Sequence, residues 1–98
     1  MGTNDNSVDD AFFDRADEVI RLANQQLGAA TPGTVSASTL YAAARFNAWV
    51  TAIGSKSGAE LERNLDETLE HFVEQYRKML KENLQDYADN FDRYIKVD

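Results

Sequence analysis

The apolar residues in the first third of the chain recur at steps of three and four, which is the spacing of one helix face. They predict a helix over about residues 8–27, after a flexible tail of residues 1–7, and the stripe comprises Phe12, Ala16, Val19, Ile20, Ala23 and Leu27. Ser7 and Asp10 resemble a capping box at the start of this helix. Gly28 follows the stripe and can adopt the left-handed conformation that ends a helix, so we expect a loop there.

A second helix is predicted over about residues 37–53, after a loop that contains Pro32, and its character differs from that of the first. It contains no acidic residue. Apolar positions occupy most of its circumference, with one face formed by Ala42, Phe46, Trp49, Val50 and Ile53 and a second, small-residue strip formed by Ala44, Ala48 and Ala52. A helix that is apolar on most sides is usually buried, so we expect this helix to be central.

A third, much longer helix is predicted over about residues 58–95. Ser57 and Glu60 form a capping box at its start, and no glycine or proline follows Gly58. Its stripe advances by about 3.67 residues per step, which favours a nearly straight helix, and comprises Leu61, Leu65, Leu69, Phe72, Tyr76, Leu80, Leu84, Tyr87, Phe91 and Tyr94. A break near Asn83 to Asp86, where helix propensity falls, is the alternative; the unbroken phase of the stripe favours continuity.

The unequal lengths of the three helices lead to a prediction about assembly. At 1.5 Å per residue the third helix would extend roughly 55 Å, whereas each of the other two would extend about 25 to 30 Å. We therefore predict an all-α fold for a single domain, residues 1–98, in which a hairpin of two short helices packs on one long carboxyl-terminal helix. We expect dimerisation to complete it through the distal part of the long helix, at Leu84, Tyr87, Phe91, Tyr94 and Ile95.

Composition and charge restrict the classes of partner. Seventeen acidic residues against ten basic residues give a formal net charge of −7, which repels phosphate backbones and anionic lipid. Neither nucleic acid nor a membrane is therefore an expected partner. The chain contains no cysteine, which excludes disulfides, zinc-thiolate sites and a thiol nucleophile. Its polar amino terminus lacks the pattern of a secretory signal, and we expect a cytoplasmic location.

The residues that could carry catalysis do not form a known active-site pattern. His71 is the only histidine, and Thr68 stands three residues before it, so the Glu-x-x-His pair of di-iron bundles is absent. The serines lie in no nucleophile-elbow motif, and no phosphate-binding loop is present. Most acidic residues fall away from the apolar stripes, as is typical of a solvated helix face. We expect a non-enzymatic protein without a cofactor; an enzyme completed by a cofactor or a partner chain is the third hypothesis.

Arg45 is the residue best placed for a binding site, because it lies in the acid-free second helix with Tyr41 one turn before it and Trp49 one turn after. A guanidinium removed from water needs a partner. Arg45 either reaches the surface or pairs with an acidic residue of another helix, or it lines a pocket with Tyr41, Asn47 and Trp49 for a small anion or a partner's carboxylate. The leading hypothesis is a homodimeric interaction protein, with an unidentified protein partner also compatible; an anion-binding module at Arg45 is the alternative.

Three segments of the chain resemble one family. They are FFDRADEVIRLANQQ at residues 12–26, VSASTLYAAARFNAWV at 35–50 and HFVEQYRKMLKENLQDYADNFDRYI at 71–95. Together they resemble a small bacterial all-helical family that is catalogued as a domain of unknown function. The resemblance covers nearly the whole chain and implies a compact helical protein. It assigns no catalytic or binding residue.

Overall fold

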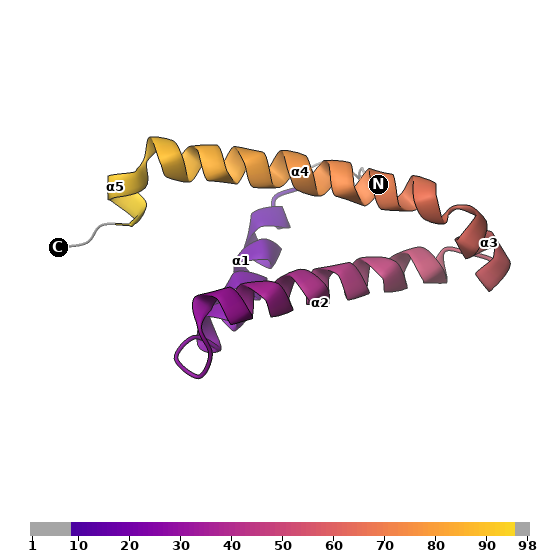
Figure 1. Ribbon diagram of the computed structural model, residues 1–98, viewed down its shortest axis with the longest axis horizontal. Helices are drawn as coiled ribbons and strands as arrows, with labels where there is room; N and C mark the ends of the chain where they lie inside the picture. The colour runs from indigo at the N-terminus through magenta and orange to yellow at the C-terminus, as the bar shows by residue number, and fades with distance from the viewer. Residues whose placement is uncertain (1–8, 96–98) are drawn as a thin grey trace. The chain divides into compact units, whose positions relative to one another are not determined.

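The structure, a computed structural model, describes residues 9–95, and every regular element in that range is a helix (Figure 1). The elements in chain order are α1 (Phe12–Gln25), α2 (Pro32–Ile53), α3 (Gly58–Arg63), α4 (Leu65–Asp89) and α5 (Phe91–Tyr94). The predicted all-α fold class is therefore confirmed. The chain divides into two units, Met1–Val50 and Thr51–Asp98.

Helix α1 begins at Phe12, later than the predicted start at residue 8. The cause is a turn centred on Asp9, whose carboxylate accepts a hydrogen bond from the backbone N–H of Ala11 at 3.0 Å. The carbonyl of Asp9 also accepts from the N–H of Phe12 at 3.0 Å, and these bonds occupy the groups that an earlier helix start would need. The predicted start is thus wrong. The predicted tail, residues 1–7, and Ser7 of the expected capping box lie outside the described residues.

Helix α2 begins at Pro32, five residues before the predicted start at residue 37. The N–H of Thr34 donates to the Thr31 hydroxyl at 3.3 Å, so Thr31 acts as the cap and Pro32 occupies the first helical position. Proline suits that position because its fixed φ is helical and its missing N–H would have no helical partner. Pro32 therefore starts this helix instead of marking a loop. The helix ends at Ile53, as predicted.

Gly28 lies between α1 and α2 with a φ of +99°, a left-handed conformation that L side chains rarely adopt. Gly28→Ala is expected to lower the free energy of unfolding by about 1 kcal/mol, because a Cβ there meets no atom within 4 Å and the cost is conformational alone. Gly33→Ala is the matched control, since Gly33 is helical, and it should raise stability by about 0.5 kcal/mol. Urea denaturation at a fixed protein concentration measures both; equal effects of one sign would contradict the expectation.

The predicted long helix is divided into α3, α4 and α5, with breaks at Asn64 and Asn90. The expected continuity over residues 58–95 is therefore wrong, and so is the alternative break near Asn83 to Asp86, because α4 runs unbroken through that segment. At Asn90 the side-chain amide donates to the carbonyl oxygen of Asp86 at 3.0 Å, a local bond that competes with the backbone pattern. The shortened α4 is about 37 Å long.

The start of α3 agrees with the sequence prediction. The N–H of Glu60 donates to the Ser57 hydroxyl at 3.1 Å, and the Glu60 carboxylate accepts from the N–H of Lys56 at 2.6 Å. The bond to Ser57 satisfies a backbone donor that a helix start would leave unpaired, which confirms the Ser57 half of the predicted capping box. The Glu60 carboxylate accepts from the N–H of Lys56, whereas a complete capping box would pair it with the N–H of Ser57.

Little apolar surface is buried within the described chain. Val35, with 5% of its surface exposed, is the only buried residue among residues 9–95. Within the first unit, no close backbone approach joins the described parts of α1 and α2; within the second, α3 approaches α4 and α4 approaches α5. The sequence predicts a central, buried second helix, whereas the large apolar side chains of α2 are exposed. The hydrophobic stripes form, and most of their large side chains are exposed.

Candidate functional site

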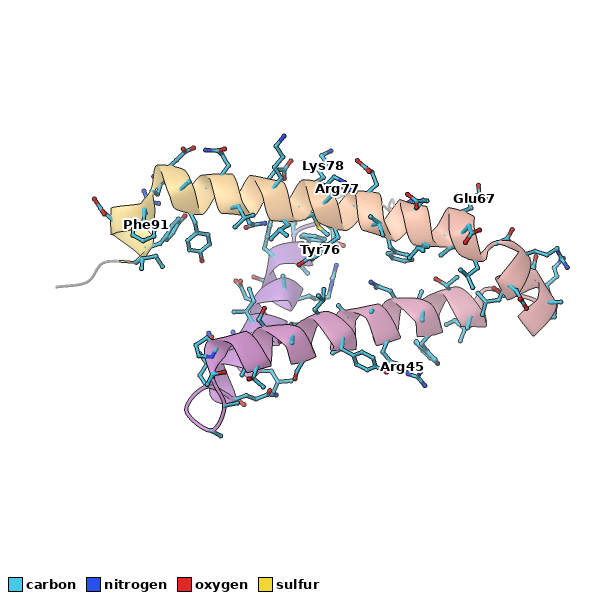
Figure 2. The ribbon with its side chains drawn as sticks, in the orientation of Figure 1. Arg45, Glu67, Tyr76, Arg77, Lys78 and Phe91 are labelled. Carbon is cyan, nitrogen blue, oxygen red and sulfur yellow. The ribbon has the colours of Figure 1, made fainter. Side chains whose placement is uncertain are left out.

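The residues expected around Arg45 do not converge on a pocket. Arg45 projects from α2 (Figure 2) and is exposed, as are Tyr41 and Trp49, with 68% and 55% of their surfaces accessible. The Trp49 ring lies beside Phe46, with ring centroids 5.7 Å apart. Asn47 is half-buried and stands two positions from Arg45, which is about 200° around the helix. The Arg45 side chain is exposed, which agrees with the alternative in which it reaches the surface, and the binding site there stays a prediction.

The distal surface, defined as Leu84, Tyr87, Phe91, Tyr94 and Ile95, lies at the junction of α4 and α5, where α5 bends away from the axis of α4 (Figure 1). The rings of Tyr87 and Tyr94 lie in contact at a centroid distance of 4.6 Å, with their planes tilted by 47°. The Tyr94 hydroxyl donates to the Asp86 carboxylate at 2.9 Å, and this bond holds α5 against the last turns of α4. All five side chains stay largely exposed, so the structure gathers the predicted interface residues at one end of the unit.

The bond to Asp86 also affects the titration of Tyr94. Because the neutral hydroxyl donates to the carboxylate and the negative charge of Asp86 opposes a phenolate, the pKa of Tyr94 is raised above 10.0. The stabilising contact is therefore fully present below the ordinary tyrosine pKa and is lost as pH rises through the raised pKa.

Asp86→Ala is expected to return the pKa of Tyr94 to its ordinary range, because both the hydrogen bond and the charge are removed. The near-ultraviolet absorbance of tyrosinate during alkaline titration measures this change. One of the four tyrosines should lose its proton at a lower pH in the variant than in the wild-type protein. Asp89→Ala removes an equal charge that makes no bond to a tyrosine and serves as the control; superimposable curves for Asp86→Ala and wild type would contradict the assignment.

A groove runs along one side of α4 and adjoins the distal surface. Its volume is about 600 Å³, and its lining comprises Val73, Tyr76, Arg77, Leu80, Lys81, Leu84, Gln85 and Ala88. Such a volume would suffice for a small molecule. The lining, however, comes from a single helix, so nothing faces it to enclose a ligand. An elongated apolar partner, such as another helix, fits this surface better.

The described residues offer no metal centre. Among residues 9–95 no group of three or more histidine, aspartate or glutamate side chains is placed to hold an ion. The ring of His71 lies edge-on to Phe72 at 5.4 Å. In the same range, no helix is both long enough and apolar enough to cross a bilayer.

Sequence reasoning missed two features of this region. One is the groove on α4, whose apolar positions were recognised but whose basic rim, Arg77 and Lys81, was not. The other is the bond between Asp86 and Tyr94, which are eight residues apart. That spacing is two helical turns and is too long for one continuous helix to bring the two side chains together. The bond therefore required the break at Asn90, which the helix pattern did not reveal.

Taken together, the helices and their exposed stripes define a class of protein: a small all-helical chain whose apolar faces are left open. Residues 12–88 match the family described as Protein of unknown function (DUF3144). Since that match spans more than half of the chain, the protein belongs to this family, and the resemblance to a domain of unknown function is confirmed. No curated protein and no solved structure matches the chain.

Proposed function

We propose that this protein is a non-enzymatic helical interaction protein that acts as a homodimer. The observation that supports the proposal is burial: hydrophobic residues make up 43% of the chain, yet Val35 is the only buried one among residues 9–95. A chain of this size normally buries about two-thirds of its surface. Apolar stripes left in water do not offset the conformational entropy lost on folding, and a second copy would cover them.

The distal surface is the proposed contact between the two copies. Its side chains include two tyrosines and a phenylalanine, the residue types that are enriched in the centres of interfaces. The bond from Tyr94 to Asp86 holds α5 in place before association, which reduces the entropy cost of binding. In a two-fold dimer the distal surface of each copy takes part in the contact.

Sedimentation velocity at tens of micromolar tests the dimer directly. The expected mass is twice the 11.0 kDa of the chain. A species of 11.0 kDa that persists at this concentration would contradict the proposal. The alternative function, anion binding at Arg45, is not proposed, because Arg45 is exposed and Asn47 lies on another face of α2.

A further inference from the structure

The charged residues beside the apolar stripe of α4 are segregated by sign. Asp66 and Glu70 lie in the first half of the helix, and Arg77 and Lys81 lie in the second. At about 100° per residue, all four fall within a sector of roughly 60° on the side of the helix that Val73 occupies. All four are exposed. This side of α4, defined by these four residues, is called the charged flank.

The charged flank is available for contact with a partner. Within residues 9–95, Asp66, Glu70 and Lys81 form no ion pair. Arg77 has one partner, Glu74, at 3.6 Å, and both side chains are well exposed. A surface ion pair of this kind contributes little stability, so Arg77 can leave Glu74 and pair with a carboxylate of a partner at little cost in free energy. Arg77 and Lys81 also border the apolar groove, so an occupant of that groove would contact them.

The charge order fits a second copy that runs in the opposite direction. In an antiparallel pair of helices the same flank of each helix meets, whereas a two-fold parallel pair sets equal residue numbers level with one another. The pairs Asp66–Lys81 and Glu70–Arg77 share one midpoint, between residues 73 and 74. An antiparallel register about that midpoint satisfies both pairs at once, and symmetry doubles them. In a two-fold parallel pair the charged flanks lie on opposite sides of the interface, so these four residues would form no pairs with one another.

We propose that the two copies associate through antiparallel α4 helices, with the two-fold axis between Val73 and Glu74. This inference rests on the proposed homodimer and specifies its geometry. The groove of each α4 receives the stripe of the other, and the charged flanks form reciprocal ion pairs between the copies. In this register Leu84 lies level with Arg63, the last residue of α3, so the distal surface extends the interface onto α3 of the second copy.

A shared midpoint is the reason to prefer a second copy over an unrelated helix. An unrelated partner requires only that its own charges oppose those of α4, and it places no condition on the spacing within α4. A two-fold contact requires that every complementary pair be symmetric about one point, and the charged flank meets that condition. For a chain with a net charge of −7, the basic half of the flank also offsets the repulsion between two copies.

Single cysteine substitutions test the direction of the helices, because the chain contains no cysteine of its own. In the proposed register the Val73→Cys side chains face each other across the two-fold axis and should form a disulfide on oxidation. The Leu80→Cys pair is separated by about 20 Å along the axis and should not, since a disulfide needs Cα atoms within about 7 Å. Non-reducing electrophoresis measures both. Crosslinking of Leu80→Cys at least as efficient as that of Val73→Cys would overturn the antiparallel register.

Charge reversal tests the flank by a second route. The variants Asp66→Lys/Glu70→Lys and Arg77→Glu/Lys81→Glu should each weaken self-association by about 30-fold, because like charges then meet. An equimolar mixture of the two should form a heterodimer with near wild-type affinity. Sedimentation equilibrium measures these affinities, and the differences should shrink at about 1 M salt, where screening acts within roughly 3 Å.

The controls use the face of α4 opposite its apolar stripe, which is adjacent to the charged flank. Glu67 and Lys78 point away from the side that carries Tyr76 (Figure 2), so Glu67→Lys and Lys78→Glu should leave the affinity unchanged. Equal weakening by control and flank variants would overturn the inference, as would a mixture that fails to regain affinity. If the wild-type protein is a dimer, either of these two results overturns the antiparallel register but leaves the proposed function intact. A wild-type monomer contradicts the proposed function itself.

Discussion

Phe91→Asp is expected to convert the dimer into a monomer at tens of micromolar, which is the largest effect we anticipate from a single substitution. In the single chain 55% of the Phe91 surface is exposed. The proposed contact with the second copy covers this exposed surface. The substitution removes an aromatic contact worth about 2 kcal/mol and introduces a carboxylate that must lose water. Because each change occurs twice in a two-fold interface, the affinity should fall by at least about 1000-fold.

A matched control separates loss of the interface from a general effect of adding charge. Phe13 in α1 is another exposed phenylalanine, and it lies outside the predicted interface. Phe13→Asp should leave the mass at that of a dimer. Circular dichroism at high protein concentration shows whether each variant still forms helices. A dimeric Phe91→Asp variant, or a monomeric Phe13→Asp variant, would place the contact away from the distal surface.

The type of secondary structure was predictable from the sequence because apolar spacing reports it directly. The end of α2 at Ile53 and the Ser57 half of the capping box were also predicted, since both rest on neighbouring residues. The starts of α1 and α2 were not. Thr31 and Pro32 are residue types that suit either a loop or the start of a helix. The hydrogen bond from the N–H of Thr34 to the Thr31 hydroxyl favours the helix start.

The divisions of the long helix were harder to predict for a different reason. An asparagine lowers helix propensity only slightly, so the pattern on either side of it keeps its phase. At Asn90 the side chain bonds to both the carbonyl and the carboxylate of Asp86, and this pair of contacts competes with continuation of the helix. Asn83 has a similar bond to the carbonyl of Met79, yet α4 continues through it. The residue type alone therefore does not locate the break.

The two candidate sites differ in how much of them the sequence could predict. The members of the distal surface were grouped from the sequence by the spacing of one continuous helix, and the structure keeps them at one end of the second unit although α5 bends away after Asn90. Their role in an interface stays a prediction. The Arg45 site depended instead on the burial of α2, which is a property of packing between helices. Arg45 and Asn47 could converge only if a second element closed over them, and no periodicity within α2 supplies that information.

The stability of the protein is expected to depend on its concentration, which is the second of the two largest effects. With Val35 as the only buried residue among residues 9–95, folding and association should form one cooperative transition. Raising the concentration about 100-fold then adds about 2.7 kcal/mol to the free energy of unfolding of the dimer.

Thermal unfolding followed by circular dichroism at about 1 µM and about 100 µM measures this effect as a rise of several degrees in the midpoint. Phe91→Asp provides the internal control, because a chain that no longer associates should give the same helical signal per residue at both concentrations. An unchanged wild-type midpoint would show that the helices are stable without a second copy, which would contradict the proposal that association covers the apolar stripes. A rise in wild type that disappears in Phe91→Asp links the open apolar stripes to the distal surface, since one substitution there removes the dependence of folding on association.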